Sequence, residues 1–221
     1  MNDQYSSGNH IVTGKRNLTE STFVLTFTRG NMQFTAGQRI LAGIKGDIDQ
    51  RDYSIYSGED DESLEILVKE IDEGNVSLKL RNCEPGHLLN ISGPYGSFTI
   101  KKEDMNTSRL IFIATGTGIS PFHSFVRTYS DIDYLLIHGI RYKEETYDRE
   151  QYDPGRYITC TSQEASQGKK TRVTDFISGF RITPDMLFYL CGNGRMIYDV
   201  SRILLNKGVP AGSIFSEIYF A

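Results

Sequence analysis

The spacing of apolar residues changes near residue 100, and this change restricts the possible folds more than any other feature. From His10 to about Ile100, apolar and polar residues alternate in short runs that end at Gly, Asn and Asp. Such alternation predicts antiparallel strands joined by turns, clearest at Thr22–Thr28, Ser63–Lys69 and Leu88–Ser92. The spacing fits a sandwich or a closed barrel. We favour a small barrel, because closure leaves no strand edge unpaired.

After residue 108 the pattern becomes strand, glycine turn and helix. An apolar run at Leu110–Ala114 is followed by Gly116–Pro121 and by a helical pattern in which Phe122, Phe125 and Val126 share one face. Alternating strands and helices predict a parallel sheet covered on both faces, with a ligand at the carboxyl ends of its strands. The other predicted elements are strands Tyr134–His138, Tyr157–Thr161 and Met186–Cys191, and helices Val173–Ile177 and Arg195–Leu205.

A polar stretch, KKEDMNTS at Lys101–Ser108, separates the two patterns. It has two cations, two acids and no periodic apolar face, which predicts an inter-domain linker. The chain has 221 residues, enough for two domains that each bury a core. We therefore expect one domain over residues 1–104 and a second over 105–221.

Composition and charge exclude several classes of protein. No apolar run approaches the roughly 20 residues of a membrane span, and Met1–His10 is polar, so we expect a cytoplasmic protein without a membrane partner. The net charge of −4 gives no general attraction to nucleic acid. Cys83, Cys160 and Cys191 are too far apart for a CxxC metal pair, so no metal site or iron–sulfur cluster is expected.

The segment ATGTGISP, at Ala114–Pro121, lies where a predicted strand passes into a helix. Its glycines would let the backbone approach a phosphate, and the helix amino-terminus supplies N–H donors and a positive dipole end. Pro121 stands where a GxGxxG motif has its third glycine, and proline suits the first helical turn. Taken alone, the segment fits a phosphate loop or a plain glycine-rich turn equally well.

The segment RDYS, at Arg51–Ser54, ends the first half in a strand-like context. Strand alternation puts Arg51 and Tyr53 on one face. The Arg fork of donors could hold a phosphate and the Tyr ring could pack on a planar ligand. Without other motifs, a surface strand with a solvated Arg would be the default interpretation.

Two segments of the second half add candidates. LCGNGRM, at Leu190–Met196, repeats the order strand, glycine turn and helix, and places Cys191 at the carboxyl end of the strand. Core packing is the default role for such a cysteine. The chain ends in SEIYFA, at Ser216–Ala221, whose aromatic residues must be buried. This segment predicts a final strand docked on the sheet, or an aromatic ring that covers a ligand.

The order and spacing of these motifs resemble the ferredoxin–NADP reductase family over nearly the whole chain. In that family an Arg-x-Tyr-Ser motif lies in a flavin-binding barrel, a Gly-Thr-Gly-x-x-Pro loop opens the nucleotide domain, and a Cys-Gly motif precedes the last helix. These motifs stand here as Arg51–Ser54, Gly116–Pro121, and Cys191 with Gly192. The resemblance implies a six-stranded antiparallel barrel that binds FAD, FMN being the less favoured flavin, followed by an NAD(P)-binding α/β domain.

The resemblance also implies roles for single residues at the flavin. Arg51 would pair with the flavin pyrophosphate, Tyr53 would lie against the isoalloxazine, and Ser54 would hydrogen-bond near flavin N5. A second phosphate segment of the family, Gly-x-x-Ser, matches GNVS at Gly74–Ser77, which alone would be interpreted as an N-capped turn. The flavin-binding residues implied in this way are Arg51, Tyr53, Ser54, Val68, Gly74, Val76, Ser77 and Tyr219.

Plant-type members of the family place Ser, Cys, Glu and Tyr around the nicotinamide and flavin rings. The matching residues here are Ser54, Cys191, Glu217 and Tyr219, although Phe220 and Ala221 follow the Tyr and leave open which aromatic covers the flavin. The residues implied for the dinucleotide are Thr115, Gly116, Thr117, Gly118, Pro121, Ser162, Lys170, Arg172, Gly192 and Met196.

The nucleotide preference depends on the loop after Tyr157–Thr161. Family members that use NADPH carry a Ser-Arg pair there, and this chain has Gln163 in place of the Arg. Lys169, Lys170 and Arg172 could bind the 2′-phosphate instead, or form a solvated basic loop. We favour NADPH, with NADH as the alternative.

The implied activity is an oxidoreductase that moves electrons between NAD(P)H and a one-electron carrier such as ferredoxin or flavodoxin, by hydride transfer between nicotinamide C4 and flavin N5. Such carriers are acidic, so we expect a basic docking patch that includes Lys79, Arg81, Lys101 and Lys102. Two alternatives remain. One is an NADH-dependent reductase component of an oxygenase. The other is a flavin-binding subunit of a larger electron-transfer complex, against which the missing cysteine cluster counts.

Overall fold

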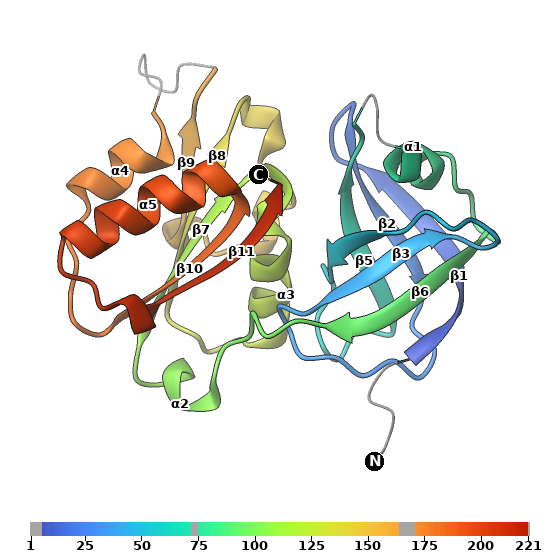
Figure 1. The fold of residues 1–221 in the computed structure, drawn as a ribbon, viewed down its shortest axis with the longest axis horizontal. Helices are drawn as coiled ribbons and strands as arrows, with labels where there is room; N and C mark the ends of the chain where they lie inside the picture. The colour runs from blue at the N-terminus through green and yellow to red at the C-terminus, as the bar shows by residue number, and fades with distance from the viewer. Residues whose placement is uncertain (1–5, 72–74, 164–170, 221) are drawn as a thin grey trace. The chain divides into compact units, whose positions relative to one another are not determined.

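The computed structural model describes residues 6–71, 75–163 and 171–220, which divide into two compact units (Figure 1). The first unit takes in the described residues up to Thr99 together with Ser120–Thr128, and the second takes in Ile100–Ile119 and the described residues from Tyr129 onward. The segment Ser120–Thr128 is helix α3. By its contacts this helix therefore groups with the first unit, although it directly follows a strand and loop of the second.

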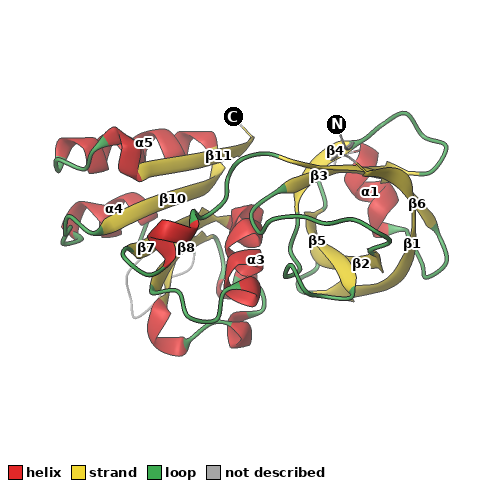
Figure 2. Ribbon diagram, turned by 90° about the horizontal axis from the view of Figure 1, so that it is seen from below, coloured by secondary structure: helices red, strands yellow, loops and turns green. Residues whose placement is uncertain are grey.

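The first unit contains a six-stranded antiparallel sheet, which confirms the predicted fold of this half (Figure 2). The strand order is β4-β3-β6-β1-β2-β5, and a bridge between Ile55, just after β4, and Ile66 of β5 joins the two edges of the sheet. A backbone hydrogen bond of 2.7 Å from Tyr56 N to Glu65 O lies beside this bridge. The strands are β1 (Ser6–Asn17), β2 (Thr22–Thr28), β3 (Arg39–Ile44), β4 (Arg51–Ser54), β5 (Ser63–Lys69) and β6 (Leu88–Tyr95).

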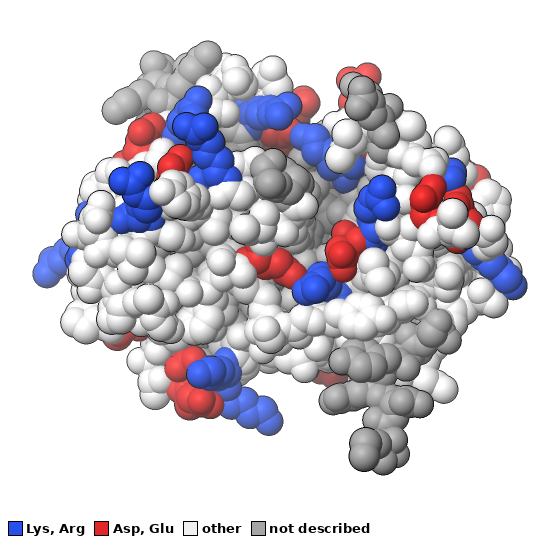
Figure 3. Space-filling model, in the orientation of Figure 1, with Lys and Arg blue, Asp and Glu red and all other residues white. Residues whose placement is uncertain are grey.

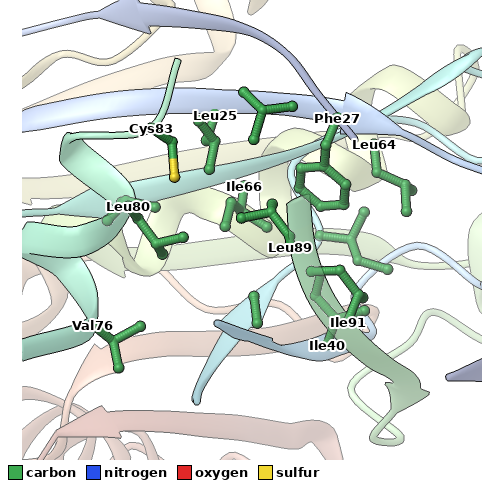
Figure 4. Close-up of a cluster of buried hydrophobic side chains, with 14 of the residues drawn as sticks. Leu25, Phe27, Ile40, Leu64, Ile66, Val76, Leu80, Cys83, Leu89 and Ile91 are labelled. Atoms are coloured by element: carbon green, nitrogen blue, oxygen red, sulfur yellow. The ribbon is translucent and has the colours of Figure 1, made fainter. Parts of the chain in front are cut away.

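Apolar side chains that point inward from this sheet form the hydrophobic core of the first unit (Figure 4). Leu25 and Phe27 lie two residues apart on β2, so strand alternation directs both to the core, where they are completely buried. Helix α1 (Asn75–Arg81) closes one end with Val76 and Leu80, which are one helical turn apart and share a face. Burying an apolar side chain of this size contributes about 1.5–3 kcal/mol, so this core holds β4 and α1 in place.

The second unit is built on a five-stranded parallel sheet with the order β11-β10-β7-β8-β9, as the strand–helix alternation predicts. Helices α4 and α5 pack on one face of it, in a buried cluster that includes Ile111, Ile113 and Val200. The elements are β7 (Arg109–Thr115), β8 (Tyr134–Ile140), β9 (Tyr157–Thr161), α4 (Val173–Gly179), β10 (Met186–Asn193), α5 (Gly194–Asn206) and β11 (Ile214–Phe220). The order places the carboxyl ends of all five strands at one edge.

The stretch Lys101–Ser108, predicted as a linker, contains one turn of helix, α2 (Lys102–Met105). Glu103 and Asp104 lie in its first turn, where acidic side chains favour the positive end of the helix dipole. This stretch therefore contains a short helical element that its sequence pattern did not predict. In the described part of the chain, no helix is both long enough and apolar enough to cross a membrane.

Candidate functional site

Strand β4 carries the RDYS motif at the edge of the first unit's sheet. Arg51 is exposed, and its guanidinium donates one hydrogen bond of 2.8 Å to Gln50 O, out of five N–H donors that an Arg has. Tyr53 is half-buried and packs against the core, and this burial raises the pKa of its phenol to about 12. Ser54 is buried. This edge therefore presents a cation and a neutral aromatic ring side by side.

Strand β5 and helix α1 carry other candidate flavin residues. The hydroxyl of Ser77 accepts a hydrogen bond of 3.3 Å from Ile71 N, and Ser77 is buried. Val68 and Val76 belong to the hydrophobic core, so only their backbone groups are available to a cofactor. Gly74 lies outside the described residues.

Two glycine-containing loops pack against each other at the carboxyl edge of the parallel sheet. A Cβ on Gly118 would lie 2.4 Å from Cys191 O, and one on Gly192 would lie 2.4 Å from Thr115 Oγ1. Gly192 also has a φ of +125°, a backbone conformation that is unfavourable for every residue other than glycine. Asn193 N donates a hydrogen bond of 3.0 Å to Thr115 Oγ1. Both glycines are thus required by the contact between the loops themselves, whether or not a phosphate approaches them.

Gly116 differs from these two glycines because its surroundings are open. It has a φ of +54°, and no atom lies within 4 Å of the place where a Cβ would be. Gly116–Ile119 forms a 3₁₀ turn between β7 and α3, in which Thr117 is buried. Pro121 is the second residue of α3 and is buried. This turn leaves space beside its backbone for a ligand.

The turn into α5 is more fully occupied by the protein itself. The side chain of Asn193 caps the helix and accepts hydrogen bonds from Arg195 N at 3.0 Å and Met196 N at 3.2 Å. Met196 is buried in the core beneath α5. Its side chain therefore packs in the protein interior.

Cys191, Glu217 and Tyr219 come together on neighbouring strands. Cys191 of β10 is paired in register with Glu217 of β11, and Cys191 is completely buried. Burial holds the pKa of the thiol well above its usual value, the charge of Glu217 raises it further, and the nearby Tyr219 opposes the rise. The thiol is therefore protonated and not a nucleophile. Ala221 and the side chain of Phe220 lie outside the described residues.

The residues proposed to set nucleotide preference are only partly described. Ser162, half-buried, donates a hydrogen bond of 3.2 Å to Ile140 O, and Gln163 is exposed. Arg172 is exposed at the start of α4, where its backbone N donates to Asp175 Oδ2 at 3.0 Å. Lys169 and Lys170 lie outside the described residues.

The sequence interpretation missed two buried histidines. His123 of α3 stacks on Tyr56, with ring centroids 3.6 Å apart, and its Nδ1 lies 2.6 Å from Tyr56 O. Beside it, Ser124 Oγ donates to Ser57 O at 2.7 Å. These contacts hold the chain directly after β4. His138 lies beside the turn Gly116–Ile119, where its Nε2 is 2.8 Å from the carbonyl oxygen of Gly116. In the sequence, the only sign that His138 is unusual is that it is a polar residue within an apolar strand.

Two protein-family models match this chain in succession. Residues 10–100 match an oxidoreductase FAD-binding domain, and residues 112–202 match an oxidoreductase NAD-binding domain. The two matches follow the two halves of the chain in order.

Individual proteins agree with these matches. The flavodoxin/ferredoxin–NADP reductase of Escherichia coli (strain K12) is 28% identical over 216 residues, which cover 85% of this chain and 87% of that protein. The toluate 1,2-dioxygenase electron transfer component of Pseudomonas putida is 22% identical, covering 95% of this chain and 67% of that protein. The crystal structure of a ferredoxin NADP+ reductase from Neisseria gonorrhoeae with bound FAD and NADP has a TM-score of 0.85 at 21% identity, and covers 98% of this chain and 99% of that one.

Proposed function

Because the chain belongs to the ferredoxin–NADP reductase-like family of oxidoreductases, which pass electrons from NAD(P)H through FAD, we propose that it uses NADPH and reduces a one-electron protein carrier, ferredoxin or flavodoxin. The observation that most supports the choice of a carrier reductase is the likeness to flavodoxin/ferredoxin–NADP reductases over most of both chains. Bound FAD would supply the redox chemistry, which is acceptance of a hydride from nicotinamide and release of its two electrons one at a time.

The first unit's residues fit an FAD molecule. Arg51 is exposed and has donors that suit the pyrophosphate, because a planar guanidinium binds phosphate oxygens in pairs. Tyr53 is packed against the core on one side and half-exposed, so it can support a flat ring system without moving. Ser54 would donate a hydrogen bond near N5. The chain thus binds and orients the flavin through one short strand.

The second unit's residues fit the nicotinamide half of the reaction. The open turn at Gly116 would receive the dinucleotide phosphates. Glu217 would orient the nicotinamide or hold a proton beside it, and the uncharged thiol of Cys191 would pack against the ring and exclude water. Tyr219, on the strand next to Cys191, would cover the flavin and move away when the nicotinamide enters.

An absorbance spectrum of the purified chain tests the proposal. We expect a yellow protein that NADPH bleaches under anaerobic conditions at lower concentration than NADH does, because the 2′-phosphate adds a charge-assisted contact. Bleaching by NADH alone would support the proposed flavin chemistry but contradict the proposed preference for NADPH. A chain that stays colourless after reconstitution with FAD and with FMN would contradict the whole proposal. Flavin binding without oxidation of either nucleotide would indicate a subunit of a larger complex.

Arg172→Ala is expected to reduce the preference for NADPH. Arg172 is exposed at the start of α4, so its guanidinium is accessible to a 2′-phosphate, and loss of one such contact raises KM for NADPH about 10-fold. KM for NADH should change less than 2-fold. Arg181→Ala is the matched control, because Arg181 is also exposed but lies two residues beyond the carboxyl end of α4. Steady-state kinetics with both nucleotides measures the effect, and equal changes for the two would show that Arg172 does not contact the phosphate.

An NADH-dependent reductase of an oxygenase is the second candidate. Gln163 stands where NADPH-dependent relatives are expected to carry Arg, and the relative from Pseudomonas putida is the electron transfer component of a dioxygenase. The anaerobic titration above separates this candidate from the first.

The proposed docking of an acidic carrier rests on a smaller basic patch than the sequence suggests. Lys79 is ion-paired with Asp47 and lies 3.9 Å from Asp49, and Arg81 lies 3.5 Å from Glu70, so acidic neighbours offset both cations. On the face shown in Figure 3, basic and acidic side chains are interspersed. Lys101 and Lys102 are exposed and remain the better candidates.

A further inference from the structure

His138 is a completely buried polar residue at the carboxyl end of β8. Both ring nitrogens have a protein partner at hydrogen-bond distance. Nε2 lies 2.8 Å from the carbonyl oxygen of Gly116, and Nδ1 lies 2.7 Å from the hydroxyl of Tyr157 on the next strand. The imidazole therefore bridges the glycine turn after β7 and the strand β9 of the same sheet.

The partners of the ring determine which nitrogen carries the proton. A carbonyl oxygen only accepts hydrogen bonds, so Nε2 must donate to Gly116. Burial lowers the pKa of His138 to about 4, so the ring is neutral at ordinary pH and Nδ1 must accept. The hydroxyl of Tyr157 then donates to Nδ1, and burial raises the pKa of this phenol, which keeps it protonated. Arg149 lies over the Tyr157 ring, 4.4 Å from its centroid.

The hydrogen bond to Gly116 sets the orientation of one peptide group. In a trans peptide the C=O of Gly116 and the N–H of Thr117 point in opposite directions. With its carbonyl held on Nε2, the Thr117 N–H is directed away from the imidazole. Gly116 has a φ of +54° and open space at its Cβ position, so the residue itself does little to prevent rotation of this peptide. The 3₁₀ turn also constrains this peptide, and His138 adds a second constraint from outside the turn.

We propose that His138 is a positioning residue for the dinucleotide: it selects the orientation of the Gly116–Thr117 peptide in which the turn binds phosphate. Tyr157 acts behind it, by keeping the proton on Nε2. The inference rests on the proposed function, since it assigns the turn to the phosphates of NAD(P)H. Neither residue contacts the reacting atoms in this proposal, so each should affect binding more than the rate of hydride transfer.

Three variants of the holoenzyme test this role. His138→Leu removes the donor and is expected to raise KM for NADPH about 10-fold with kcat within 2-fold, because one hydrogen bond to the turn is lost. His138→Gln keeps an N–H donor near the position of Nε2 and should recover KM to within about 3-fold of the wild type. Tyr157→Phe should give an intermediate KM. His87→Gln, at an exposed histidine of the first unit, is the control and should leave KM unchanged.

A second measurement does not depend on catalysis. Imidazole ¹⁵N chemical shifts of His138 should show a protonated Nε2 and an unprotonated Nδ1 from pH 5 to 9, and Tyr157→Phe should weaken this pattern. A protonated Nδ1 would overturn the proposal. So would a Leu variant with a lower Tm but an unchanged KM, or a Gln variant no better than Leu. If the Leu variant fails to fold, the Gln and Phe variants and the shifts still decide. A wild type that NADPH does not reduce would refute the proposed function, whereas the shifts would still report on the hydrogen bonds.

Discussion

Gly192→Ala is expected to lower the free energy of unfolding of the second unit by about 4 kcal/mol. Two costs combine at this residue. Its φ of +125° is unfavourable for any side chain, and the new Cβ would lie 2.4 Å from Thr115 Oγ1 and 2.7 Å from Thr115 O. The second of these atoms belongs to the backbone, so it cannot move aside by a side-chain rotation. Denaturant unfolding followed by circular dichroism measures the loss.

Three other glycines of the same unit separate the two costs. Gly208 has a φ of +87° but no atom near its Cβ position, so Gly208→Ala should cost about 1–2 kcal/mol from the backbone alone. Gly118 has no such φ, but its Cβ would lie 2.4 Å from Cys191 O, so Gly118→Ala should cost about 2 kcal/mol from the contact. Gly212 has neither feature, and Gly212→Ala should stay within about 0.5 kcal/mol of the wild type. A Gly192 variant no less stable than the Gly208 variant would show that the two loops separate easily.

Arg51→Ala is expected to weaken FAD binding about 10-fold or more, because a hydrogen bond between charged groups is worth about 1.5–3 kcal/mol. Arg51 is exposed on β4 and uses one donor internally, on Gln50 O. Titration of the apoprotein, followed by quenching of flavin fluorescence, gives the dissociation constant. Arg51→Lys should recover only part of the affinity, since an ammonium group cannot form two parallel bonds to phosphate.

Riboflavin provides the internal control for this prediction. It carries the isoalloxazine but no phosphate, so its affinity should be the same in the wild type and in the Arg51→Ala variant. Lys45→Ala, at another exposed cation of the first unit, should change neither ligand. Equal weakening of FAD and riboflavin would show that Arg51 acts on the ring or on the fold of β4, and not on the phosphates.

Much of the fold could be predicted because strand and helix periods are local properties. The strands Ser63–Lys69 and Tyr157–Thr161 have the predicted bounds, and the strand predicted to end at Cys191 continues only to Asn193. Short helical turns were harder to predict from the sequence. Helix α2 and the 3₁₀ turn Lys143–Glu145 are too short to show a period, so their sequences resemble loops.

Helix α3 shows what a local pattern leaves open. Its sequence position, directly after the glycine turn, predicts a place in the second domain. Its buried polar contacts go instead to the residues after β4, through His123 to Tyr56 O and Ser124 to Ser57 O. The apolar face was predictable from the helical spacing of Phe122 and Phe125, and both side chains are completely buried. Which surface that face covers depends on residues more than 60 positions away in the chain.

The sequence by itself determined the two kinds of sheet, their order and the motifs at Arg51–Ser54 and Gly116–Pro121, because these depend on neighbouring residues and on where a strand ends. Only the tertiary structure decided why Gly118 and Gly192 must be glycine. Only the tertiary structure also showed that His138 hydrogen-bonds to the turn Gly116–Ile119. The physical reason is that each depends on atoms brought within hydrogen-bond or van der Waals distance by the parallel sheet. The sheet aligns the carboxyl ends of strands that are far apart in the chain.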